Sequence, residues 1–138
     1  MTNEITFATN SLFENVTFNR NADSWVFSFS GNIYVSASGF WRLLRNNNIA
    51  FVSLDNGHQF GLLKPLDLVE EVKKELESKR LTKIEVIKDT SDLVLTFTHG
   101  LKLEIYIAST GYETFDFSIN GKRYIGLGSG DIAIMDSH

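Results

Sequence analysis

One histidine stands where it could do acid–base chemistry. His58 closes the run Asp55-Asn56-Gly57-His58, and an aspartate three residues from a histidine could form a proton-transferring pair. Asp-Asn-Gly is also typical of a turn. Three interpretations stay open: a structural turn, a binding-site residue, or a catalytic pair that Glu113 joins in a cleft. Because no nucleophile is tied to the pair and no G-x-S-x-G motif is present, we expect a protein that is not an enzyme and has no catalytic residues.

Metal and phosphate sites find no support in the sequence. The chain has no cysteine and three histidines, and none of His58, His99 and His138 has a second histidine at the short spacing of a zinc site. The run from Gly126 to Gly130 is rich in glycine, but a phosphate loop also needs a lysine and a following helix. A strand-like segment follows instead, so we expect a turn there, and neither a metal nor a cofactor.

Composition and charge exclude several classes of protein. The chain has 138 residues, 43% of them hydrophobic, and 13 basic against 17 acidic residues give a net charge of −4. A mildly acidic chain is a poor nucleic-acid binder. It lacks the run of about 18 apolar residues of a membrane helix and the basic start of a secretory signal. We therefore expect a single domain over residues 1–138 that is cytoplasmic and binds neither nucleic acid nor membrane.

The pattern predicts one amphipathic helix over residues 66–79. Asp67 and Glu70 have the spacing of a capping box, and Glu75 with Lys79 could form an ion pair one turn apart. Apolar residues recur at helical spacing along one face, and they are Leu68, Val69, Val72 and Leu76.

Most of the other segments alternate between apolar and polar residues, which is typical of half-buried strands. Turn residues at Gly31-Asn32, His99-Gly100 and Asn120-Gly121 predict three hairpins. The expected strands cover residues 25–29, 33–37, 49–54, 83–88, 93–97, 101–107, 115–119, 124–125 and 132–135. Strands in two meander-like blocks around one helix indicate an α+β fold with a mostly antiparallel sheet. The blocks could form one curved sheet or two packed sheets. An edge strand could pair with a partner or with a second copy, and the oligomeric state stays open.

Over residues 25–135 the chain resembles a family of small bacterial domains. The matching segments are Phe40-Trp41-Arg42-Leu43-Leu44, the run DNGHQFGL from Asp55 to Leu62, Pro65-Leu66-Asp67, the run DLVLTF from Asp92 to Phe97, Leu103-Glu104-Ile105, Gly111-Tyr112-Glu113, and the segment from Gly126 to Ile134. Where the family has Gly-Tyr-Glu-Ser-Trp, this chain has Gly-Tyr-Glu-Thr-Phe. Such domains look like the immunity proteins of bacterial toxin systems, including contact-dependent growth inhibition. The resemblance implies a non-catalytic protein that binds one cognate toxin domain and blocks its active site.

If the partner is such a toxin, acidic and aromatic side chains are the contacts to expect, because nucleic-acid-cutting toxins have basic clefts and aromatic residues dominate binding energy. The candidate contacts are Trp41, Asp55, His58, Glu70, Glu71, Tyr112 and Glu113. Trp41 could instead belong to the core. The alternatives are a module that binds a small ligand or another protein, and a hydrolase built on Asp55, His58 and Glu113.

Overall fold

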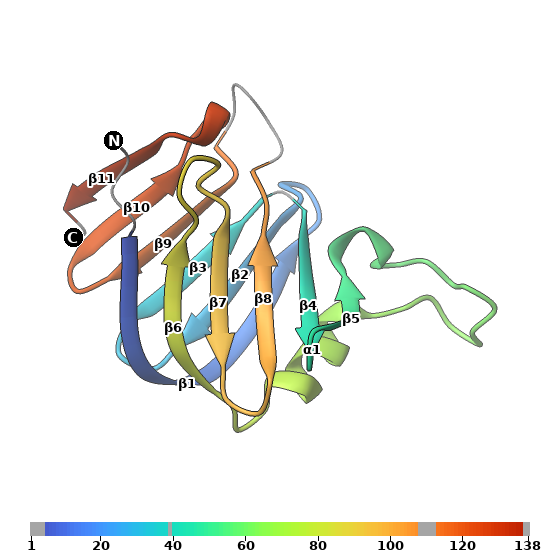
Figure 1. Ribbon diagram of the computed structural model, residues 1–138. Coiled ribbons are helices and arrows are strands. Elements are labelled where there is room, and N and C mark those ends of the chain that lie inside the picture. The colour runs from blue at the N-terminus through green and yellow to red at the C-terminus, as the bar shows by residue number, and fades with distance from the viewer. Residues whose placement is uncertain (1–4, 39, 108–112, 137–138) are drawn as a thin grey trace.

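The computed structural model describes residues 5–38, 40–107 and 113–136 (Figure 1). The expected α+β fold, mostly antiparallel sheet with one α-helix, is confirmed. The strands are β1 (Ile5–Asn19), β2 (Ser24–Phe29), β3 (Ile33–Ala37), β4 (Trp41–Arg45), β5 (Asn48–Val52), β6 (Arg80–Val86), β7 (Leu93–Phe97), β8 (Leu101–Ile105), β9 (Phe115–Ile119), β10 (Lys122–Gly126) and β11 (Ile132–Asp136). The helices are the 3-10 turns η1 (Ser53–Asp55) and η2 (Gly128–Gly130) and the α-helix α1 (Leu68–Leu76).

All these strands belong to one continuous sheet, which folds over on itself. Its order is β11-β10-β9-β3-β2-β1-β6-β7-β8-β4-β5, and every described pairing is antiparallel. Figure 1 shows the half from β6 to β5 crossing in front of the half from β2 to β11. The two packed halves bury their facing side chains between them.

The long strand β1 makes this fold possible because each half of the sheet uses a different part of it. Residues 5–12 pair with β6, and residues 13–19 pair with β2. The register shifts between Ala8 and Ser11 on one side and between Phe13 and Asn15 on the other. Such bulges bend a strand and increase its twist, so the sheet turns at the middle of β1.

Aromatic rings fill the space between the two halves. Trp41 of β4 meets Trp25 of β2 edge to face, with ring centroids 5.1 Å apart. Phe29 of β2 lies 5.9 Å from Phe97 of β7, and the two rings are tilted at 37°. Edge-to-face and offset ring pairs contribute about 0.5–1.5 kcal/mol beyond their buried area. The buried residues of both halves form one hydrophobic cluster.

The predicted hairpins are confirmed, but the two predicted blocks do not stay separate. β2 and β3, β7 and β8, and β9 and β10 pair as expected. Strands from before and after the helix then interleave, since β3 pairs with β9 and β4 with β8. Strands β1 and β4 were not predicted from the sequence, and in β1 the bulges break the regular alternation that marks a strand.

Helix α1 is shorter than predicted and spans Leu68–Leu76. Asp67 caps the helix as predicted, because its Oδ1 accepts a hydrogen bond from the Glu70 amide at 3.3 Å, but the reciprocal bond of a capping box is not found among the described residues. The helix ends where Ser78 takes a φ of +64°. Glu75 pairs with Arg45 of β4 instead of Lys79, so it ties α1 to the sheet. Neither α1 nor the two 3-10 turns, the helices found among the described residues, could span a membrane.

We predict that Leu76→Ala lowers the free energy of unfolding by about 2–5 kcal/mol, because it leaves a cavity in a fully buried site. The matched change Leu63→Ala removes the same atoms from a side chain that is 99% exposed, and it should alter stability by less than about 0.5 kcal/mol. Urea unfolding followed by circular dichroism measures both. Equal losses in the two variants would contradict this packing of α1.

Candidate functional site

The feature that stands out from the folded sheet is a projecting loop, residues 53–67, between β5 and α1. Figure 1 shows it extending sideways from the sheet, beyond β5. Its base is tied to the core on both sides. The Ser53 hydroxyl accepts a hydrogen bond from the Trp41 amide at 3.0 Å, and the Asn56 side chain accepts one from the Leu68 amide at 3.0 Å.

Backbone hydrogen bonds give the projecting loop a defined shape. The Gly57 amide donates to the Leu66 carbonyl at 2.8 Å, and the Leu66 amide donates to the His58 carbonyl at 2.7 Å. At the tip, the Leu62 amide donates to the Gln59 carbonyl at 2.7 Å. The Gln59 side-chain amide in turn donates a hydrogen bond to the Leu62 carbonyl at 2.9 Å. A loop that is held in this way loses little conformational freedom when it binds.

The projecting loop shows large apolar side chains to solvent. Leu63 is 99% exposed, Leu54 69%, Phe60 65% and Leu62 49%. Phe60 also has a φ of +44°, a region that bulky residues rarely adopt and that occurs at functional sites. Large exposed apolar side chains that are concentrated in one short segment are typical of interaction surfaces. These side chains were not predicted as contacts, and their signal in the sequence is an apolar run that fits neither a helix nor a strand.

Asp55 and His58 lie at the base of this loop, and the contact between them is a backbone hydrogen bond of a turn. The His58 amide donates to the Asp55 carbonyl at 3.0 Å, so the bond that joins them belongs to the backbone. The His58 ring stacks on Phe60 at 5.4 Å, with 17° between the planes. In the described part of the chain, no side-chain hydrogen bond links Asp55 to His58 or to Glu113. The turn interpretation accounts for this geometry.

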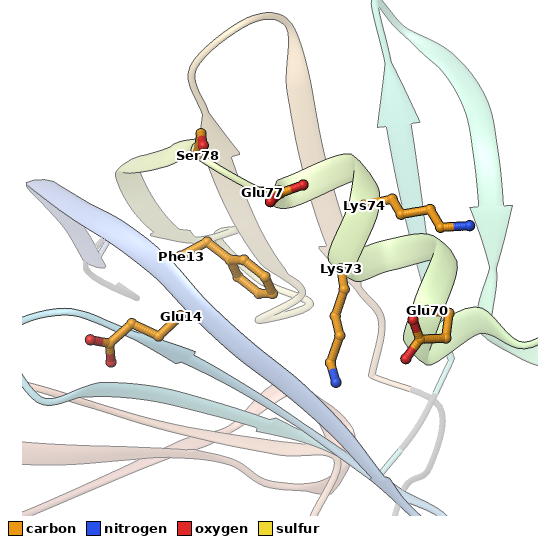
Figure 2. Close-up of a pocket in the computed structure, with 7 residues that line it drawn as sticks. All are labelled: Phe13, Glu14, Glu70, Lys73, Lys74, Glu77 and Ser78. Carbon is orange, nitrogen blue, oxygen red and sulfur yellow. The ribbon is translucent and has the colours of Figure 1, made fainter.

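Glu70 and Glu71 lie in the first turn of α1, directly after the projecting loop. Glu71 lies 3.7 Å from Lys74, while Glu70 borders a groove of about 330 Å³ between α1 and β1. Figure 2 shows Lys73 of α1 pointing along this groove toward β1, with Glu70 beside it. The first turn of the helix therefore carries two acidic residues directly after the loop in the sequence, and one of them borders the groove against β1.

Two predicted contacts, Trp41 and Glu113, lie outside the projecting loop and the first turn of α1. The Trp41 side chain is 0% exposed, so a partner that docks on this fold cannot reach it, which corrects its assignment as a surface anchor in favour of the core interpretation. Its indole Nε1 has no hydrogen-bond partner among the described residues. Glu113 is exposed two residues before β9, where its carbonyl accepts a hydrogen bond from the Ser38 hydroxyl. Tyr112 lies outside the described residues, as does His138.

A polar cluster lies on the outer face of the sheet, with Arg42 on β4, Glu104 opposite it on β8, and Tyr106 just after β8. Glu104 Oε1 accepts hydrogen bonds from Arg42 Nε and from the Tyr106 hydroxyl, each at 2.7 Å. Burial raises the pKa of Glu104, but the two hydrogen bonds and the charge of Arg42 outweigh it, so this pKa lies below its usual value. Burial and the bond to Glu104 raise the pKa of Tyr106. Phe40 stacks on Tyr106 at 5.3 Å.

Comparisons with protein-family models, curated proteins and solved structures found no match to this chain. The resemblance to immunity proteins therefore stays a prediction. Within the described residues, no group of three or more histidine, cysteine, aspartate or glutamate side chains could hold a metal ion.

The Arg42–Glu104–Tyr106 cluster predicts a pH dependence of stability. A carboxylate whose pKa is lowered by folding stabilises the protein above its unfolded pKa of about 4.3, and this contribution is lost as the pH falls through the folded pKa. Glu104→Gln should therefore lower the melting temperature most near neutral pH, and the difference from the unmodified protein should shrink in acid. A difference that is the same at both ends of the pH range would contradict this account.

Proposed function

We propose that this protein is a non-catalytic binding protein that neutralises a cognate bacterial toxin domain, and that it docks through the projecting loop. The observation that supports the proposal is the exposure of Leu54, Phe60, Leu62 and Leu63 on a loop whose backbone is fixed by its own hydrogen bonds. Exposed apolar side chains on a preorganised support are the arrangement that gives binding hot spots at protein interfaces.

The shape of the loop favours a protein partner over a small ligand. Small-molecule sites are concave and enclose most of the ligand, whereas this loop stands out from the sheet (Figure 1). A projecting apolar tip suits a cleft on the partner, and inserting it into an active-site cleft would exclude substrate. In this mechanism the toxin is blocked by occupation of its cleft, and no chemical step takes place.

The charges near the loop favour a basic partner surface. The loop contains Asp55 and Asp67 against one lysine, Lys64, and Glu70 and Glu71 lie in the first turn of the helix that follows it, so acidic residues outnumber basic ones here. Toxins that cleave nucleic acids need basic clefts, and complementary charges speed association with such surfaces. Glu70 and Glu71 would then lie at the rim of the interface, where charges affect the association rate and its salt dependence more than the dissociation rate.

The partner to test is the C-terminal toxin domain encoded immediately upstream, with binding measured by calorimetry. Leu63→Ala and Phe60→Ala should each weaken binding by about 2 kcal/mol, or about thirtyfold in Kd, because each truncates an apolar anchor. Tyr34→Ala is the matched control, since Tyr34 is 49% exposed on β3 and lies outside the loop. It should leave Kd unchanged.

Two outcomes would overturn different parts of this proposal. No binding at tens of micromolar would remove the toxin role for that neighbouring protein. Tight binding that neither Leu63→Ala nor Phe60→Ala weakens would keep the toxin role but refute docking through the projecting loop. Neutralisation is checked separately, by loss of toxicity when the two proteins are mixed.

A further inference from the structure

A second unpartnered feature lies at the end of the sheet away from the projecting loop. Among the described strands, β11 is an edge strand whose one neighbour is β10, and Figure 1 places it on the opposite side of the molecule from β5. Ile134 and Met135 of β11 are each 53% exposed. Edge strands are usually protected by lysine, proline or a bulge. Residues 132–136 contain neither lysine nor proline, and their ladder to β10 has no register shift.

The hydrogen-bond pattern shows which backbone groups of β11 face outward. The Leu127 amide donates to the Asp131 carbonyl at 2.9 Å just before the ladder. Because hydrogen-bonded and non-bonded pairs alternate in an antiparallel ladder, Ala133 and Met135 direct their amides and carbonyls toward β10. The same groups of Ile132, Ile134 and Asp136 therefore point to the free edge of the sheet.

We propose that this free edge pairs with β11 of a second copy of the chain, antiparallel and with the two Ile134 residues opposite each other. This register is the one that matches the outward groups, because Ile134 faces Ile134 and Ile132 faces Asp136 in hydrogen-bonded pairs. Every outward amide and carbonyl of the three residues then finds a partner. The dimer joins two sheets into one through a two-fold axis at Ile134.

The side chains of β11 are self-complementary in this register. On one face the two Ile134 side chains meet, which buries an apolar group that is half exposed in the single chain. On the other face Met135 lies opposite Ala133, a large residue against a small one. No like charges lie opposite each other, since Asp136 faces Ile132 and remains 3.5 Å from Lys122 of its own chain. Cross-strand pairs of this kind stabilise antiparallel sheets.

The other edge strand, β5, is less suited to self-pairing. Its ladder to β4 has a register shift between Leu43 and Leu44, and a bulge next to an edge twists that edge away from a partner. Ile49 of β5 is nevertheless 55% exposed, much as Ile134 is. This residue therefore provides a matched control for the apolar exposure alone.

A single strand pairing is a small interface, so the dimer should be weak, with a Kd on the order of tens of micromolar. Sedimentation of the full chain from about 5 to about 500 µM should show the mass rising from one chain toward two. Ile134→Lys places like charges opposite each other and should keep the protein monomeric throughout. Ile49→Lys should leave the concentration dependence unchanged. An unmodified protein that stays monomeric at the highest concentration would overturn the proposal.

Cysteine cross-linking tests the register itself, and the absence of native cysteines makes it unambiguous. Non-bonded antiparallel pairs have Cα atoms about 4.5 Å apart, which suits a disulfide. A mixture of Ala133→Cys and Met135→Cys chains should therefore form a disulfide-linked heterodimer under mild oxidation, faster than either variant forms a homodimer. Dimers without this preference would refute the proposed register. Melting temperatures of all variants confirm that each is folded.

Discussion

The whole architecture depends on the sharing of one strand between two ladders. Residues 5–12 of β1 pair with β6 and residues 13–19 pair with β2. The sheet folds back on itself at the bulges between these two parts of the strand. The bend brings Trp25 of one half against Trp41 of the other. Without it, the inner faces of both halves would be exposed, and a single α-helix could cover only part of either.

The features that sequence analysis predicted correctly are local ones. Turn residues located the hairpins, and in the structure Asn32, His99 and Asn120 all adopt the left-handed conformation that such turns require. The cap at Asp67 located the start of α1. The interleaving of strands was not predictable, because the pairing of β3 with β9 depends on packing between segments about eighty residues apart and not on any local signal.

At the candidate site too, features set by neighbouring residues were predictable from the sequence, and features set by tertiary packing were not. The turn character of Asp55 and His58 followed from neighbouring residues. Whether an apolar residue is buried depends on what packs over it, so the sequence could not separate Trp41, which is fully buried, from Leu63, which is fully exposed. The projecting loop and the free edge of β11 are both exceptions to the rule that apolar side chains are covered. They lie at opposite sides of the molecule (Figure 1), so a partner on one leaves the other accessible.

The sharing of β1 has a consequence for synthesis on the ribosome. Its second pairing partner, β6, begins at Arg80, and β9, the partner of β3, begins at Phe115. Residues 5–12 of β1 therefore have no strand to pair with until β6 is made, and the outer edge of β3 has none until β9 is made. Non-local pairings of this kind slow folding and leave strand edges open to aggregation in the nascent chain. The serines and asparagines of the N-terminal strands are consistent with this delay, because polar side chains keep unpaired strand edges soluble in water.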